Sequence, residues 1–290
     1  MYLNFAAYAV LALSIVLALT LKSRTVPLSV FVFACAFGFV AGLLDFAAIA
    51  SILLIGALSY LVFGRSQARP LRLLFIALLL VSGHLVMTHA LPGFDNLKVV
   101  SGAQVSPDGI PYSMYLNFDK AALGFFLVLF AVTPLQSGSQ WGACFRSAAI
   151  YFVPTAGLLI LLGCFTGLVA FDPKVPPFLP VWILSNLLIT CVAEEAFFRR
   201  FALAEIRDFA GPGWIGSATA LILSSLFFAY YHLSGGPLFS VFSLVAGLCY
   251  GAAFLKSNRV EVAILVHFLV NLTHILLFTY PFLASSVSLQ

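Results

Sequence analysis

Ten apolar runs, each about as long as a bilayer is thick, follow one another along the chain and limit its possible folds. They lie at 2–21, 27–44, 47–64, 71–90, 121–137, 148–171, 180–200, 214–232, 238–255 and 261–280. A membrane-spanning helix needs about 20 mostly apolar residues. The chain is 62% hydrophobic and 8% charged, whereas a soluble domain carries about 25% charged residues. The sequence therefore predicts an all-α fold, a polytopic transmembrane helical bundle with about ten spanning helices.

The positions of lysine and arginine set an orientation for this bundle. If the N-terminus lies outside, the outer connections hold only Lys98, Lys120 and Lys174. The inner connections hold the other 11 of the 14 basic residues, namely Lys22, Arg24, Arg65, Arg69, Arg72, Arg146, Arg199, Arg200, Arg207, Lys256 and Arg259. Such a bias follows the positive-inside rule. We expect an integral, multi-pass protein of the plasma (inner) membrane, in contact with the lipid bilayer.

Other features exclude several classes of protein. The five cysteines are odd in number, scattered through apolar runs and without a CxxC pair, which argues against a disulfide framework or a thiolate zinc site. No basic stripe is present to neutralise phosphates, so we expect no nucleic-acid partner. The first run lacks a basic n-region and a cleavage site, which favours a retained helix over a signal peptide.

The longest connection, at about 91–120, is predicted to be an extramembrane loop. It contains the turn-forming combinations PGFDN and SPDG, and Val99 and Val100 could form a short strand. We interpret it as a solvated cap over the helices, with a lid or a substrate-docking loop as the alternative.

Ionisable residues inside or next to the apolar runs are the candidates for function, because one at the bilayer centre costs at least about 2.5–3.5 kcal/mol. They are Asp45, His84, His89, Glu194, Glu195, His232, His267 and His274. Asp45 and His89 lie at or near the ends of their runs, so we expect them to have no special role. For His84 and His274 we expect a hydrogen bond with a neighbouring carbonyl.

Glu194 and Glu195 lie side by side in the segment CVAEEAFFRR. Desolvation and mutual repulsion both favour a proton on one of two adjacent carboxylates in a low dielectric. Arg199 is four residues after Glu195, close enough on a helix to pair with it. Glu194 would then be poised for proton transfer. The alternative is a stabilising ion pair at the membrane edge.

Two later segments add polar groups at helical spacing. Phe228 and His232 are four residues apart, as are His267 and Asn271, so each pair is expected to share a helix face. A carboxylate can take a proton from water, one histidine can assist, and a histidine with an asparagine can donate hydrogen bonds to an oxyanion. The set therefore favours hydrolysis by water.

These three segments resemble the motifs of a known family. EEAFFRR fits Glu-Glu-x-x-x-Arg, FAYYH fits Phe-x-x-x-His and HFLVN fits His-x-x-x-Asn, in the family order. The chain is similar here to the CPBP family of CAAX prenyl proteases and bacteriocin-processing enzymes, also called the Abi family. The resemblance covers about residues 180–280. It implies two parts, N-terminal transmembrane helices at 1–175 and a CPBP-like catalytic core at 176–290.

The resemblance also implies an all-helical intramembrane endopeptidase and a role for each motif residue. Glu194 would be the general base that activates water, with His232 beside it, and His267 and Asn271 would form the oxyanion hole. Glu195, Arg199 and Phe228 would support these groups. A mechanism without a metal ion is favoured. The alternative is a zinc ion held by Glu194, His232 and His267, although HExxH is absent.

The expected partner is a membrane-associated protein or peptide substrate, with a possible part in C-terminal processing or sorting of exported proteins. Two other classes stay open. Carboxylates and histidines within the membrane also mark proton-coupled transporters, although no inverted repeat is evident. A non-catalytic membrane scaffold or immunity protein with the same fold is the third class.

Overall fold

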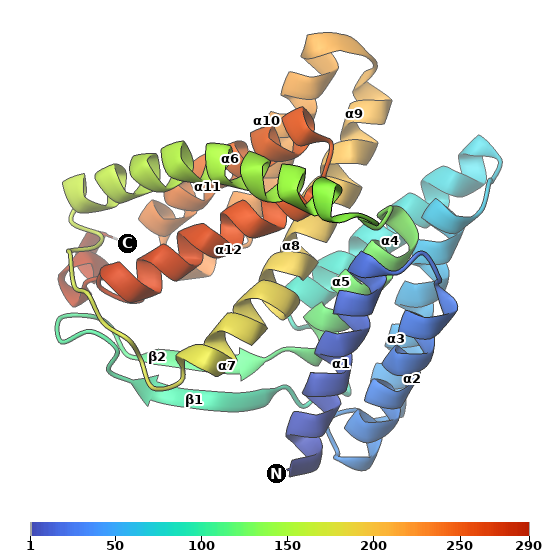
Figure 1. Ribbon diagram of the computed structural model, residues 1–290, viewed down its shortest axis with the longest axis horizontal. Helices are drawn as coiled ribbons and strands as arrows, with labels where there is room; N and C mark the ends of the chain where they lie inside the picture. Colours follow the sequence, from blue (N-terminus) through green and yellow to red (C-terminus); the bar gives the residue numbers. More distant parts are fainter. Residues whose placement is uncertain (1, 290) are drawn as a thin grey trace. The chain divides into compact units, whose positions relative to one another are not determined.

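The computed structural model describes residues 2–289, and helices make up most of it (Figure 1). Each of the ten apolar runs contains one helix, and eight helices among the described residues are long and apolar enough to cross a membrane. They are α1 (Tyr2–Thr20), α3 (Phe46–Ser59, continued to Gly64), α4 (Arg69–Met87), α6 (Gly138–Phe165), the helix Leu179–Ala210, α10 (Gly213–Tyr230), α11 (Pro237–Ser257) and α12 (Val260–Leu277). The all-α prediction is confirmed.

The two remaining helices are shorter than the runs that predicted them. Helix α2 (Thr25–Val40) has 16 residues and α5 (Phe118–Ala131) has 14. Helix α5 stops before Pro134, since the residue before a proline is disfavoured in the helical region. Nearly all of its side chains are buried. A helix enclosed by protein does not have to match the thickness of the hydrocarbon layer, which explains how it can be about 21 Å long.

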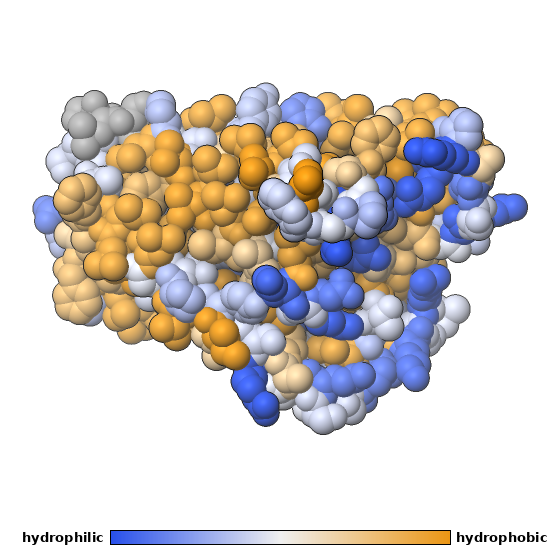
Figure 2. All heavy atoms as spheres, turned by 90° about the horizontal axis from the view of Figure 1, so that it is seen from above, coloured by the Kyte–Doolittle hydropathy of each residue, from blue (hydrophilic) through white to orange (hydrophobic). Residues whose placement is uncertain are grey.

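Apolar side chains cover much of the surface. Phe46, Val153 and Phe165 are 80%, 67% and 89% exposed, and Figure 2 shows a face on which apolar residues predominate and hydrophilic residues gather in clusters. Large exposed apolar areas suit contact with hydrocarbon rather than water. Together with the eight candidate spans, this surface identifies an integral membrane protein.

The chain forms two compact units that alternate along the sequence. Unit 1 comprises Met1–Leu97, Tyr115–Trp141 and Leu188–Phe201, and unit 2 comprises Lys98–Met114, Gly142–Leu187 and Ala202–Gln290. The helix Leu179–Ala210 contributes its middle to unit 1 and its ends to unit 2. The division into N-terminal helices and a catalytic core at residue 175 concerns function and stays a prediction.

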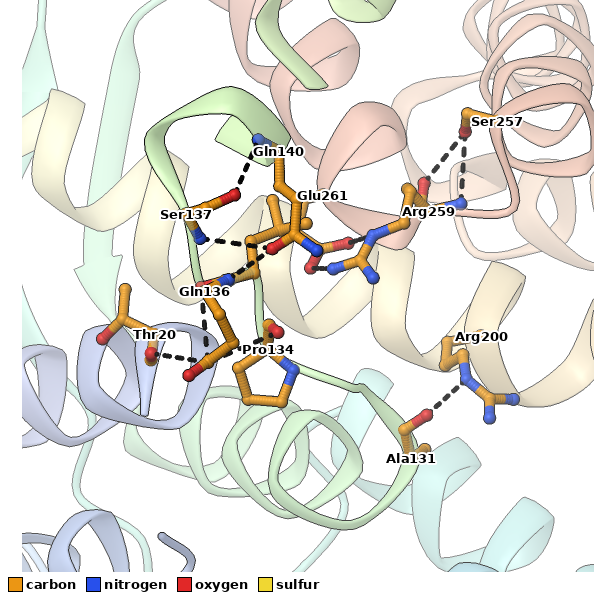
Figure 3. A network of polar contacts seen from close by, with 11 residues as sticks. Thr20, Ala131, Pro134, Gln136, Ser137, Gln140, Arg200, Ser257, Arg259 and Glu261 are labelled. Carbon is orange, nitrogen blue, oxygen red and sulfur yellow. Dashed lines mark hydrogen bonds and ion pairs between the residues drawn. The ribbon is translucent and has the colours of Figure 1, made fainter. Parts of the chain in front are cut away.

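Unit 1 is built around α5, which packs against α1, α3, α4 and α8 (Val192–Glu195). Phe31 stacks on Phe125 with ring centroids 4.2 Å apart. The end of α5 is fixed by Arg200, whose Nε donates a hydrogen bond to the Ala131 carbonyl at 2.6 Å (Figure 3). A cation at the carbonyl end of a helix also interacts favourably with the helix dipole.

In unit 2, α10 packs against α9 (Ala204–Ala210) and α11, and α11 packs against α12. Just before α12, the Arg259 guanidinium pairs with Glu261 and so fixes the start of that helix (Figure 3). The acidic residue lies in the first turn, where it also complements the helix dipole.

The predicted loop at 91–120 contains a two-stranded hairpin, β1 (Leu97–Ala103) and β2 (Tyr112–Leu116). The short strand expected at Val99 and Val100 is therefore confirmed. The residues between β1 and β2 form hydrogen bonds with the segment after α12. The Tyr280 amide donates to Ser106 Oγ at 2.8 Å, and the Ile110 amide donates to the Phe282 carbonyl at 3.1 Å. The hairpin thus covers the end of α12.

Lys174 ties a second loop to the same end of α12. Its ammonium donates hydrogen bonds to the carbonyls of Asp172 and Phe278 and lies 3.1 Å from Asp172 Oδ2. Hydrogen bonding from Ser106, with a smaller contribution from Lys174, lowers the pKa of the Asp172 carboxyl. These polar contacts therefore fix the loop of Lys174 at this end of unit 2.

Candidate functional site

The acidic pair lies on a distorted stretch of the helix Leu179–Ala210. That helix begins with α7 (Leu179–Leu184), and α8 with Glu194 and Glu195 stands between two π-helical turns, Ser185–Cys191 and Ala196–Leu203. π-Helical turns are rare and frequently occur at functional sites. The wider turns change the angle at which neighbouring side chains leave the helix.

Glu195 and Arg199 form a fully buried ion pair. Arg199 Nε lies 3.1 Å from Glu195 Oε2, and both side chains are 0% exposed. The spacing of four residues matches the pair expected from the sequence. A buried carboxylate and a buried guanidinium each have a high desolvation cost, which their mutual attraction offsets. The pair thus joins two turns of the helix directly beside Glu194.

Glu194 has a cationic neighbour of its own. Lys120 Nζ, on the first turn of α5, lies 3.6 Å from Glu194 Oε1, with side chains 16% and 9% exposed. The sequence placed Lys120 in an outer connection and gave it no role. A lysine directly before a long apolar run was the available signal, but on its own it only marks a helix end.

Gly124 allows α5 and α8 to approach closely. A Cβ atom built on Gly124 would lie 2.9 Å from Cα of Ala193, the residue before Glu194. We expect Gly124→Ala to lower the free energy of unfolding by about 1–3 kcal/mol, the usual cost of overpacking a core. Thermal denaturation in detergent measures the effect. Gly142→Ala is the matched control, because nothing lies within 4 Å of its added Cβ; equal stability of the two variants would contradict the close approach.

The residues of the third motif, His267 and Asn271, share one face of α12 in unit 2. The His267 ring is 5% exposed and lies nearly parallel to the Tyr250 ring, at 19° and 4.6 Å between centroids. One turn later, Asn271 Nδ2 donates a hydrogen bond to Asn186 Oδ1 at 3.3 Å. Tyr250 fixes the plane of the imidazole and Asn186 orients the amide. Both partners were missed from the sequence, although Asn186 is a polar residue inside an apolar run.

His232 does not lie on the helix that was expected to carry it. Helix α10 ends at Tyr230, and His232 follows in a turn before Leu233–Gly235. The sequence SGGP stops the helix there because glycine and proline disfavour its continuation. Nδ1 of His232 lies 2.8 Å from the Phe228 carbonyl. A carbonyl only accepts, so Nδ1 carries a proton, and in the neutral ring Nε2 is then the acceptor.

His232, His267 and Asn271 line one cavity of about 140 Å³ in unit 2. Phe228 lies against both histidines, with its ring centroid 4.4 Å from His232 and 6.0 Å from His267. The remaining walls are mostly apolar side chains of α6, α11 and α12. A cavity of this size has room for several water molecules.

The other ionisable candidates have local partners. Asp45 caps α3 by accepting hydrogen bonds from the amides of Ala47 and Ala48. His274 also lines the cavity, and its Nε2 lies 3.1 Å from the Thr279 carbonyl. The expected bond from His274 to a neighbouring carbonyl is therefore confirmed, whereas that of His84 stays a prediction. His89 pairs with Asp119 at 2.6 Å.

The donor set offers nitrogen and oxygen ligands in both units. No group of three or more His, Cys, Asp or Glu side chains is arranged to hold a metal ion among residues 2–289. A neutral histidine nitrogen can accept a hydrogen bond from water or bind a metal.

Comparison with known proteins gives one match. Residues 176–273 match the family model described as Type II CAAX prenyl endopeptidase Rce1-like. The matched segment includes all three motifs and confirms the resemblance noted from the sequence. No curated protein matches the chain, and no solved structure does.

Proposed function

Because residues 176–273 carry the match to the Rce1-like family of CAAX-type proteases, we propose that this chain is an intramembrane endopeptidase that hydrolyses a peptide bond with a glutamate-activated water. The observation that carries the proposal is the cavity of unit 2, where His232, His267 and Asn271 meet. An apolar bundle needs none of these groups for packing. The family implies a membrane-associated protein substrate and a bilayer environment.

Glu194 is the general base in this proposal. It takes a proton from water, and the resulting hydroxide adds to the carbonyl carbon of the scissile bond. The carbon–nitrogen bond then breaks, and the proton passes to the departing amine. His232 assists in the activation of the water. Glu195 and Arg199 support the first glutamate through their buried ion pair.

His267 and Asn271 form the oxyanion hole. Both can donate an N–H bond to the oxygen that becomes negative when hydroxide adds, and such donors act best when they are fixed beforehand. The stacking of His267 on Tyr250 and the bond of Asn271 to Asn186 supply that fixation. Phe228 supports the site by packing against both histidine rings.

A mechanism without metal is part of the proposal, with zinc on Glu194, His232 and His267 as the alternative. Glutamate can activate water as a base, whereas zinc would do so by lowering the pKa of a bound water. Treatment with a chelator and back-addition of zinc separates the two. Full activity after chelation supports the glutamate mechanism, and loss that zinc restores supports the alternative.

The proposed substrate is cleaved near its C-terminus, close to a lipid-modified cysteine. In the motif that gives the family its name, a prenylated cysteine is followed by three residues. The mostly apolar walls of the cavity suit an apolar segment of substrate. Location in the plasma membrane and a part in sorting exported proteins are further elements of the proposal.

The proposal is tested with purified chain in proteoliposomes. Peptides with a prenylated, an acylated or an unmodified cysteine four residues from the C-terminus are supplied, and the fragments are identified by mass spectrometry. We expect release of a short C-terminal fragment. Absence of cleavage together with proton or solute flux would instead support a transporter, and absence of both would support a scaffold or immunity protein.

A further inference from the structure

Lys120 is a lysine in an unusual place, within the apolar interior of unit 1. Its side chain is 16% exposed and its ammonium lies 3.6 Å from Glu194 Oε1. Lysines are rarely buried to this extent without a paired charge. The adjacent carboxylates therefore each have a cation, Arg199 for Glu195 and Lys120 for Glu194. Two cations offset the repulsion that two ionised neighbours would otherwise suffer in a low dielectric.

The first turn of α5, which carries Lys120, is fixed by hydrogen bonds with polar side chains. The Phe118 amide donates to Asn96 Oδ1 at 2.8 Å, so a side chain from outside the helix caps it. Asp119, 2% exposed, accepts hydrogen bonds from Asn96 Nδ2 at 3.0 Å and from His89 Nδ1 at 2.6 Å. These bonds limit the movement of the turn that presents the ammonium.

The rest of α5 is fixed against the helix that carries the glutamates. Gly124 lies one turn after Lys120 on the same face and brings α5 against Ala193. At the other end, Arg200 bonds to the Ala131 carbonyl. Helix α5 is therefore held at its start, middle and end, and the position of Lys120 relative to Glu194 follows from these contacts.

We propose that Lys120 is a positioning residue, whose ammonium holds the Glu194 carboxylate in the ionised form and in the orientation that accepts a proton from water. This inference rests on the proposed function of Glu194. A carboxylate in apolar surroundings favours its neutral form, and an adjacent cation opposes that tendency. Rate depends on the reacting atoms being held in near-attack geometry, which a fixed partner provides.

The test compares Lys120→Met, which keeps the length of the side chain without its charge, with Lys120→Arg. We expect Lys120→Met to lower kcat by about 10-fold with little change in KM, the effect of one lost charge-assisted contact. Lys120→Arg should restore most of the loss because it returns the cation. Lys22→Met is the matched control and should cleave like the wild type, since Lys22 is an exposed lysine outside the cluster.

Several outcomes would overturn the inference. An unchanged or higher kcat in Lys120→Met would do so, as would equal defects in the Met and Arg variants, which would indicate packing alone. Thermal denaturation shows whether each variant is folded, and Lys120→Gln replaces a Met variant that is not. Glu194→Gln separates the two proposals. If it cleaves normally, both fail; if it is inactive while Lys120→Met is normal, only the role of Lys120 fails.

Discussion

Glu194→Gln is expected to lower kcat/KM for peptide cleavage by at least about 100-fold, the contribution of a general base. The amide has nearly the same shape as the carboxylate, but it cannot take a proton from water. Because the substitution removes one buried charge without leaving a cavity, the variant should remain folded. The measurement is fragment release in proteoliposomes, quantified by mass spectrometry at several substrate concentrations.

Glu205→Gln is the matched control for this experiment. Glu205 lies in α9, eleven residues after Glu194 on the same long helix and outside the acidic pair. We expect it to retain wild-type cleavage. Normal cleavage by Glu194→Gln would remove the general base from the account, and a parallel loss in both variants would show that the assay reports general damage to the helix.

Arg199→Leu is expected to lower the free energy of unfolding by about 3–5 kcal/mol, the range for breaking one side of a buried ion pair. Glu195 is 0% exposed, so its carboxylate would lose its guanidinium partner in a place that water hardly reaches. Thermal denaturation in detergent measures the loss. Arg207→Leu, an exposed position on α9, is the control and should change little.

A double variant tests the reason for that loss. Glu195→Leu combined with Arg199→Met removes both charges and leaves apolar groups, and such replacements are often neutral or stabilising. We therefore expect the double variant to be more stable than Arg199→Leu alone. If both are equally unstable, the loss comes from packing of the long arginine side chain and not from an uncompensated charge.

The fold could be predicted from the sequence because the solvent dictates it. Runs of apolar residues in a chain with few charges are stable as helices in lipid, and each predicted run does contain a helix. The apolar runs do not show which helices are enclosed by other helices. Hydropathy does not separate a lipid-facing helix from α5, whose side chains face other helices and which is only 14 residues long.

The candidate residues could be found from polarity and spacing, but their geometry could not. The i,i+4 rule predicts the pair Glu195–Arg199 well, because both residues lie on one helix. The same spacing brings His232 against Phe228, with ring centroids 4.4 Å apart, although His232 itself lies in a turn after α10. It says nothing of Lys120, Asn186 and Tyr250, because their contacts come from elements distant in the sequence. Contacts of that kind depend on packing, which a single sequence does not specify.

Cleavage in water enriched with ¹⁸O, by the wild-type chain in proteoliposomes, tests the central claim most directly. Hydrolysis by an activated water inserts oxygen from the solvent into the carboxylate formed at the cut. The account predicts ¹⁸O in that new carboxylate and none in the intact substrate. If the folded chain releases no labelled product from any membrane-associated peptide, lipid-modified or not, the account is contradicted.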